Sequence, residues 1–428
     1  MSGKLAGAAS EIGRPTRGRR ADWPVVSALT ALCLAPGCGD DGPLFETGGG
    51  SSGTTGDVAD STATTLPAAG TSTGEPPGGP DTGVDTGSTG TPADGSSTGQ
   101  PAGDSSSSGG GNPPGAVAEC FEGLYVNSID GLGPDYDQFR ATPGSHCQGT
   151  DHQDIAGVQR AVFLGDSVTV GTPPWAGVQY YRSLVADALE AEFGLQFGQG
   201  FLQDETTWKG ANVFEGQAGV IRSGDFAACA EWGARTDDLT PTQIPQCFEE
   251  GDFDATTLVI MTMGGNDIAN MTKNAIDGAT MEEMWAQAQE MVDLKREAVE
   301  WLVEPDRFPN GVFVVFANVY EFTDGTGEVE SCDVSALAGF DQPVPAPDDL
   351  ADVVVWIQEQ YMDIAVSTST DMVFMFEGFC GHGFNADNPE APCYRGPGNE
   401  NWFDFTCTHP NDVGHIELAD MFVQTITE

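Results

Sequence analysis

Arg160-Ala-Val-Phe-Leu-Gly-Asp-Ser-Val168 is the stretch that decides the fold. Its first part, Arg160-Ala-Val-Phe-Leu164, is a short apolar run typical of a buried strand. A Gly-Asp-Ser turn follows, and apolar residues then recur with helical spacing over 178–193. Strand, turn and helix in this order indicate one unit of a parallel sheet covered by helices.

The same alternation continues toward the C-terminus. Three further buried strands are predicted, at 257–263, 312–317 and 372–376. Helices are predicted over 281–303, over 350–366 and from Asn411 onward. Strands that are apolar throughout and alternate with helices are typical of a sheet buried on both faces. The sequence therefore predicts an α/β fold with helices on both sides of a mainly parallel sheet.

The first quarter of the chain has a different composition. Residues 48–115 are almost entirely Gly, Ser, Thr, Pro, Asp and Ala. Such a segment cannot bury enough apolar surface to offset the entropy lost on ordering. We predict a disordered tether over 38–116 and one compact domain over 117–428, long enough to enclose a substantial core.

The N-terminus predicts export. Five basic residues lie in the first twenty positions, and a short apolar run follows over 23–38. We interpret 1–37 as a signal peptide, too short in its apolar part to span a bilayer comfortably. Leu34-Ala-Pro-Gly-Cys38 resembles a bacterial lipoprotein signal, in which Cys38 would carry the lipid. Cleavage after a small residue, with Cys38 incidental and the protein secreted, is the alternative. We expect a lipid-anchored protein of the bacterial cell envelope or surface, in contact with membrane only through that anchor.

Charge excludes one class of partner. The chain has 65 acidic and 16 basic residues, a formal net charge of −49. Nucleic acid is not an expected partner, because binding to phosphates needs clustered Lys and Arg. We interpret the acidity as solubility in a salty exterior rather than as cation binding.

Eight cysteines lie in the compact domain, and an even number in an exported chain predicts disulfides. Their spacing does not suggest a zinc site. The connectivity is not determined by sequence. Pairing of nearest neighbours gives Cys120–Cys147, Cys229–Cys247, Cys332–Cys380 and Cys393–Cys407.

Ser167 is a candidate nucleophile. Its hydroxyl lies at a strand-to-helix turn, where backbone N–H groups point at whatever binds there. Gly-Asp-Ser also fits a plain turn. A serine needs a base to become a nucleophile, and His409 near the C-terminus is the candidate. Two segments between them offer candidate donors, Gly233 in a turn of small residues and Asn266 after a buried strand.

The order and rough spacing of four segments resemble the SGNH/GDSL hydrolase family over about 160–428. These are Gly165-Asp-Ser-Val168, Trp232-Gly-Ala-Arg235, Gly264-Gly-Asn-Asp267 and Thr408-His-Pro-Asn411. The resemblance implies a three-layer α/β/α, flavodoxin-like fold with a mainly parallel five-stranded sheet. It also implies a serine hydrolase that needs no metal or organic cofactor.

Carried over residue by residue, the resemblance makes Ser167 the nucleophile and His409 the general base. The backbone N–H groups of Ser167 and Gly233 and the side-chain amide of Asn266 would form an oxyanion hole. Gly233 alternatively serves only a tight turn, and Asn266 alternatively caps the strand end.

The sequence departs from the family at one position. The family usually has an Asp three residues before the histidine, where its carboxylate orients the imidazole. Thr406 stands there, and the nearest acid is Asp404. We expect Asp404 to orient the ring, provided that a disulfide at Cys407 reshapes the turn. The alternative is a backbone carbonyl and a Ser–His dyad.

The expected reaction is hydrolysis of carboxylic esters through an acyl-enzyme, with lipid acyl esters as the favoured substrates. Acetyl esters of carbohydrates are the alternative within the family. From another class, the domain is alternatively a catalytically silent binding module on a tether. We expect a monomer.

Overall fold

The computed structural model describes residues 117–121, 124, 132–172, 179–200, 204–210 and 220–428. The chain divides into two units, Met1–Gly99 and Gln100–Glu428, and every described residue belongs to the second. The predicted signal peptide, Cys38 and the predicted tether lie outside the described residues.

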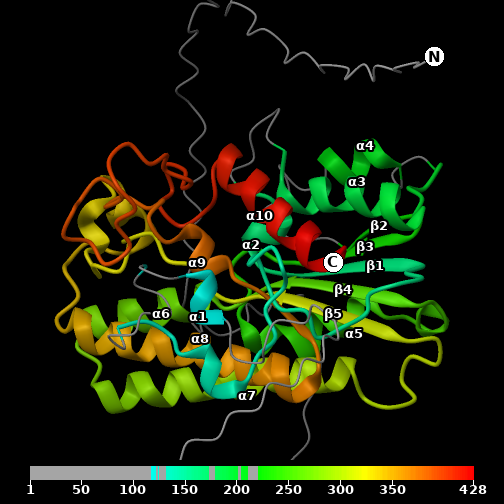
Figure 1. The fold of residues 1–428 in the computed structure, drawn as a ribbon, viewed down its shortest axis with the longest axis horizontal. Helices are drawn as coiled ribbons and strands as arrows, with labels where there is room; N and C mark the ends of the chain where they lie inside the picture. The colour runs from blue at the N-terminus through cyan, green and yellow to red at the C-terminus, as the bar shows by residue number, and fades with distance from the viewer. Residues whose placement is uncertain (1–116, 122–123, 125–131, 173–178, 201–203, 211–219) are drawn as a thin grey trace, which may run out of the picture. The chain divides into compact units, whose positions relative to one another are not determined.

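The domain is built on one six-stranded sheet with the order β2-β3-β1-β4-β5-β6 (Figure 1). The strands are β1 (Arg160–Gly165), β2 (Ile221–Ser223), β3 (Phe226–Ala228), β4 (Thr257–Thr262), β5 (Val312–Ala317) and β6 (Asp371–Val373). Strands β3, β1, β4, β5 and β6 are parallel, and β2 pairs antiparallel with β3 at one edge. Numbered along the chain, the parallel strands follow the flavodoxin-like order 2-1-3-4-5. The predicted α/β fold class is confirmed, and the sheet has six strands rather than five.

Helices cover both faces of the sheet. They are α1 (Val117–Cys120), α2 (Ser167–Val170), α3 (Tyr181–Phe193), α4 (Glu205–Gly210), α5 (Ile244–Cys247), α6 (Gly265–Ile276), α7 (Met281–Leu302), α8 (Pro347–Thr368), α9 (Met375–Phe379) and α10 (Asp412–Ile426). Figure 1 shows α3 and α10 on one side of the strands and α7 and α8 on the other. None of the helices among the described residues is long and apolar enough to cross a membrane.

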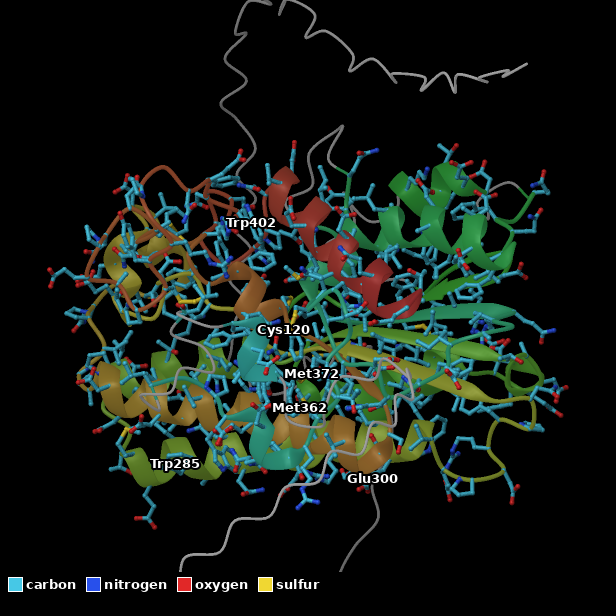
Figure 2. All side chains as sticks on the ribbon, in the orientation of Figure 1. Cys120, Trp285, Glu300, Met362, Met372 and Trp402 are labelled. Carbon is cyan, nitrogen blue, oxygen red and sulfur yellow. A yellow bond between two sulfur atoms is a disulfide. The ribbon has the colours of Figure 1, made fainter. Side chains whose placement is uncertain are left out.

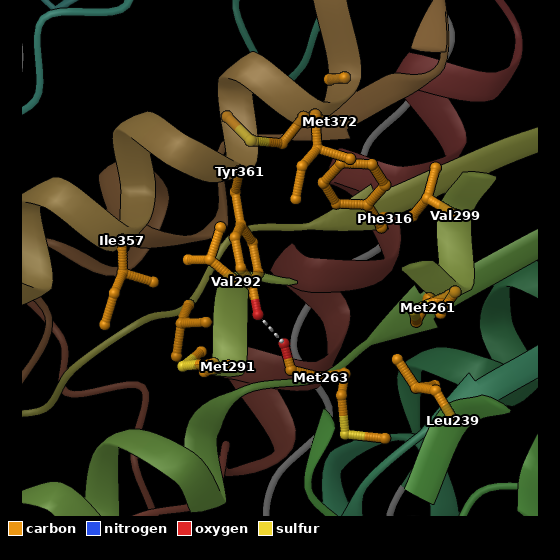
Figure 3. Close-up of a cluster of buried hydrophobic side chains, with 14 of the residues drawn as sticks. Leu239, Met261, Met263, Met291, Val292, Val299, Phe316, Ile357, Tyr361 and Met372 are labelled. Atoms are coloured by element: carbon orange, nitrogen blue, oxygen red, sulfur yellow. Dashed lines mark hydrogen bonds between the residues drawn. The ribbon is translucent and has the colours of Figure 1, made fainter. Parts of the chain in front are cut away.

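Two hydrophobic cores result from the period of two along each strand. In β1, Val162 and Leu164 belong to the core beneath α6, α7 and α8. Ala161 and Phe163 belong to the core beneath α3 and α10. Figure 3 shows part of the first core, where the Tyr361 hydroxyl donates to the Met263 carbonyl oxygen at 3.2 Å. The strand that carries the Gly-Asp-Ser turn is therefore fixed from both faces.

The sequence predicts most elements correctly, and the main error lies near β6. The strand predicted over 312–317 is β5, and the long helix predicted over 281–303 is α7. The strand predicted over 372–376 ends at Val373, and the chain continues into α9. It leaves the sheet because the Phe374 and Phe376 N–H groups donate to the Gln148 carbonyl and the Asn318 side chain. Strands β2 and β3 and helix α6 were not predicted.

The eight described cysteines form four disulfides. Several disulfides in one domain are typical of an exported protein. The pairings Cys120–Cys147 and Cys229–Cys247 are as predicted. The other two predicted pairs are wrong, because the structure joins Cys332 to Cys407 and Cys380 to Cys393. Cys380–Cys393 closes a local loop of 13 residues, whereas Cys332–Cys407 joins segments 75 residues apart.

One buried charge is unusual. Lys295 on α7 is completely buried, and its Nζ lies 3.0 Å from the Met261 sulfur and 4.7 Å from the centre of the Phe316 ring. Within the described part of the chain, no carboxylate forms an ion pair with it. Burial lowers the pKa of Lys295 from 10.5 to about 7, against the attraction of Asp166 and Asp267. By contrast, the large side chains on the outside of α7 are solvated, as Trp285 shows (Figure 2).

We predict that Lys295→Met stabilises the domain at neutral pH. The unfolded chain binds more protons than the folded one between pH 7 and 10.5, so the penalty of burying Lys295 is fully present below pH 7 and vanishes above 10.5. Urea unfolding of the variant at pH 7 should give an unfolding free energy higher by about 1 to 4 kcal/mol. Lys209→Met, which removes a half-exposed lysine paired with Asp187 and Glu205, is the control and should change little. An unchanged or lower stability of Lys295→Met would contradict the prediction.

Candidate active site

Ser167 begins α2 directly after the carboxyl end of β1. The Asp166 side chain caps this helix by accepting from the Val168 N–H at 3.0 Å. Gly165 has a φ of 142°, and a side chain there would collide with the Thr262 carbonyl oxygen of the neighbouring strand β4. The turn is thus narrow enough to project the Ser167 hydroxyl beyond the end of the sheet.

His409 lies against this hydroxyl. Its Nε2 is 2.8 Å from Ser167 Oγ, although the two residues are 242 positions apart. The loop that carries His409 is held by the Tyr320 hydroxyl, which donates to the Thr408 carbonyl oxygen at 2.8 Å. Asn411 then caps α10 by accepting from the Val413 N–H at 2.9 Å. The structure therefore brings the two predicted residues within one hydrogen bond of each other.

The other ring nitrogen of His409 contacts a hydroxyl. Thr406 Oγ1 lies 2.7 Å from His409 Nδ1 and 2.5 Å from Asp404 Oδ1. The Asp404 carboxylate makes no direct contact with the ring among the described residues, because Thr406 Oγ1 stands between them. That Asp404 orients the ring stays a prediction. No backbone carbonyl takes that position either, among the residues that the structure describes.

The Cys332–Cys407 disulfide fixes this turn from outside. Cys407 lies between Thr406 and His409 and has a φ of 71°, in the left-handed region that residues other than glycine rarely adopt. The turn also closes on itself, since the Asp404 N–H donates to the His409 carbonyl oxygen at 2.9 Å. As the sequence suggested, a disulfide at Cys407 shapes the segment that holds Asp404 near the histidine.

Burial sets the ionisation of both groups. Burial, with a smaller contribution from the nearby His415, lowers the pKa of His409 to about 4. Burial raises the pKa of Asp404 to about 6, although two hydrogen bonds from Thr406 oppose the shift. At neutral pH the imidazole is therefore neutral and able to accept the Ser167 proton, and Asp404 is largely ionised.

The segments that carry the predicted oxyanion donors Ser167, Gly233 and Asn266 are connected to one another by hydrogen bonds. The Gly165 carbonyl oxygen accepts from the Glu231 N–H at 3.0 Å, which anchors the segment after β3 two residues before Gly233. Gly233 is exposed, with a φ of 75°. Asn266, in the first turn of α6, donates through its side-chain amide to the Ala234 carbonyl oxygen at 2.9 Å. Asn266 and the Gly233 turn are thus neighbours at the carboxyl ends of β1, β3 and β4.

Sequence reasoning missed the structural roles of two side chains at the site, the buried Gln243 and the half-buried Asp267. Gln243 is fully buried, and its side chain donates to the Gly165 carbonyl and accepts from the Gly165 N–H, both at 2.8 Å. Asp267 accepts from the N–H and the hydroxyl of Thr236, which ties α6 to the Gly233 segment. No local pattern marks Gln243, which lies in a π-helical turn over Leu239–Gln243. Asp267 was marked only by its place beside Asn266.

The other four described histidines lie outside the Ser167–His409 pair. His415 is completely buried on α10, and its Nε2 lies 3.2 Å from the Thr172 carbonyl oxygen. His146, His152 and His382 lie in loops. Among the described residues, no group of three or more His, Cys, Asp or Glu side chains is arranged to hold a metal. A cavity of about 110 Å³ lies beside Thr236 and Asp267, on the side of α6 and α7, and includes neither Ser167 nor His409.

Comparison with known proteins adds only distant likenesses. No family model and no curated protein matches the chain. Among solved structures, a gut microbial diltiazem-metabolizing enzyme is 13% identical with a TM-score of 0.38, over 63% of this chain and 46% of that enzyme. An extracellular lipase from Streptomyces rimosus is 17% identical with a TM-score of 0.35, over 62% of this chain and 98% of the lipase. The chain thus spans just under half the length of the first enzyme. Scores this low carry no function from either protein to this chain.

We predict that the reactivity of Ser167 falls in two steps as the pH is lowered. The raised pKa of Asp404 means that it is protonated below about pH 6, and the lowered pKa of His409 means that it stays neutral down to about pH 4. The rate of labelling by a fluorophosphonate reagent should therefore begin to fall near pH 6 and be lost near pH 4. Asp404→Asn should remove the upper step. A single step near pH 6.5, with circular dichroism showing an intact fold, would contradict the assignment.

The Cys332–Cys407 disulfide should matter for reactivity as well as stability. Replacing both cysteines by Ser releases the turn that carries Thr406 and His409, and displacement of the base should slow labelling on the order of 10- to 100-fold. The matched control is Cys380→Ser with Cys393→Ser, which removes a local bridge and should leave the rate nearly unchanged. Both variants are to be compared well below their unfolding temperatures. Equal effects of the two pairs would refute a specific role.

Proposed function

We propose that this protein is a serine hydrolase that cleaves carboxylic esters through an acyl-enzyme. The observation that carries the proposal is the 2.8 Å hydrogen bond between Ser167 Oγ and His409 Nε2 at the carboxyl edge of the sheet. The resemblance of the four sequence segments to SGNH/GDSL hydrolases agrees with it. A serine that is hydrogen-bonded to a neutral, oriented imidazole is the arrangement that nucleophilic acyl transfer requires.

The proposed reaction has two halves. Ser167 Oγ attacks the ester carbonyl while His409 Nε2 takes the hydroxyl proton, and the alcohol then leaves with that proton. Water, activated by His409 in the same way, attacks the acyl-enzyme and releases the acid and free Ser167. His409 suits the base role because its lowered pKa keeps it neutral at pH 7.

The negative charge on the carbonyl oxygen would be stabilised by three donors. The N–H of Ser167 lies at the first position of α2, where no helical acceptor is available to it. Within the described residues, the Gly233 N–H donates to no other group. The Asn266 amide, now on the Ala234 carbonyl, would turn one N–H toward the oxyanion. Each such donor is typically worth 10²- to 10³-fold in rate.

Lipid acyl esters are the proposed substrate class. Phe405, between Asp404 and Thr406, is 57% exposed, and Ile416 on the first turns of α10 is 41% exposed. Both residues lie within seven positions of His409 in the sequence, and apolar side chains there would suit an acyl chain better than the hydroxyl-rich surface of a sugar. O-acetyl groups on carbohydrates are the second candidate substrate. We also propose that the protein is exported and held at the bacterial envelope through Cys38.

Labelling by a fluorophosphonate probe tests the reaction. The wild-type protein should be labelled at Ser167, and Ser167→Ala and His409→Ala should lose labelling while keeping the wild-type circular dichroism spectrum. Substitution of the buried His415 is not a suitable control, so Ser183→Ala, a serine on α3, serves instead and should label normally. Failure of the folded wild type to react would overturn the proposal.

A panel of p-nitrophenyl esters of increasing chain length tests the substrate class. Lipid acyl specificity predicts that kcat/KM rises from acetate to medium and long chains. Turnover of acetate alone would favour carbohydrate deacetylation. Absence of turnover with every ester would favour a silent binding module.

A further inference from the structure

Thr406 contacts the proposed base but has no part in the reaction steps given above. It lies three residues before His409, where the family resemblance led us to expect an Asp, and it takes the ring nitrogen that a carboxylate would normally occupy. Asp404 lies one contact farther away, and it is buried, with 8% of its surface exposed. Three consecutive side-chain contacts therefore connect Ser167 to Asp404, through His409 and then Thr406.

The direction of the hydrogen bonds follows from the number of protons available. An ionised carboxylate only accepts, so the single hydroxyl proton of Thr406 is donated to Asp404 Oδ1 at 2.5 Å. The Thr406 oxygen then presents only lone pairs to His409 Nδ1, 2.7 Å away. The ring must carry its proton on Nδ1, which leaves the lone pair of Nε2 facing Ser167 Oγ. This is the tautomer that a general base requires.

The backbone holds Thr406 in this role. The Thr406 N–H also donates to Asp404 Oδ1, at 2.8 Å, so the carboxylate grips the residue at two points. Cys407, the next residue, is fixed by its disulfide to Cys332. The second carboxylate oxygen, Asp404 Oδ2, is buried and has no hydrogen-bond partner among the described residues. The carboxylate thus accepts hydrogen bonds from Thr406 and is shielded from solvent.

We propose that Thr406 is a positioning residue that replaces the direct acid of a catalytic triad and transmits the charge of Asp404 to His409 through its hydroxyl. The inference rests on the proposed function. No proton moves to Asp404 during the reaction. When His409 takes the Ser167 proton, the hydroxyl that is polarised by Asp404 stabilises the imidazolium through its lone pair, because hydrogen bonds in such a chain polarise one another.

The test compares three substitutions at two positions. Thr406→Val removes the hydroxyl at nearly constant shape, and kcat should fall on the order of 10²- to 10⁴-fold with little change in KM. Thr406→Ser keeps the hydroxyl and should restore most of kcat, which a merely structural role of the methyl group would not do. Asp404→Asn should also lower kcat, and adding it to Thr406→Val should cause little further loss, because both act through one path.

Nitrogen-15 NMR of the histidines provides a readout that is independent of turnover. Wild-type His409 at pH 7 should be protonated on Nδ1 and unprotonated on Nε2, and Thr406→Val should lose this preference. A wild-type ring protonated on Nε2 would overturn the proposal even if Thr406→Val failed to fold. Wild-type kcat in folded Thr406→Val, failure of Thr406→Ser to restore it, or losses that multiply in the double variant would overturn it as well. These outcomes differ from failure of the proposed function, in which the wild type itself would neither be labelled nor turn over esters.

Discussion

The parallel pairing of β1 with β3 on one side and β4 on the other is the constraint on which the site depends. Parallel strands end at the same edge of a sheet, so the segments that follow Gly165, Ala228 and Thr262 emerge side by side. Those segments carry Ser167, Gly233 and Asn266. Gln243 reinforces the junction by bonding both backbone groups of Gly165 from a distant turn. The sheet thus sets where the three candidate oxyanion donors emerge, and two of them are backbone N–H groups of the segments that follow its strands.

Sequence reasoning succeeded where the signal is local. Buried strands such as β5 and long amphipathic helices such as α7 show their period directly, and Ser167 and His409 stand next to such elements. It failed where contacts between distant segments decide. The Cys332–Cys407 bridge spans 75 residues, and β6 is cut short because the chain beyond it donates hydrogen bonds to Gln148 and Asn318. Which group contacts His409 Nδ1 depends on the conformation of the turn at Cys407, which is fixed by a disulfide to a distant segment. The spacing of residues in the sequence does not reveal that conformation.

Ionisable groups that would prefer water gather beneath this edge of the sheet. Burial raises the pKa of Asp166 to about 7 and that of Asp267 to about 6, and lowers that of Lys295 to about 7. Each of these shifts costs stability at neutral pH, because the ordinary charged form is disfavoured in the fold. Such a concentration is more typical of a functional site than of an ordinary core. The domain compensates with two cores, one on each face of the sheet, and four disulfides.

The separation of 242 positions between Ser167 and His409 has a consequence for the time course of biosynthesis. Translation at about 5 to 20 residues per second delivers the serine roughly 10 to 50 seconds before the histidine. During that interval the growing chain contains Ser167 but not the imidazole that would activate its hydroxyl. The segment that carries His409 must be made and docked before the proposed base reaches Ser167. Under the proposed function, labelling at Ser167 therefore reports that the chain has been made and folded through His409.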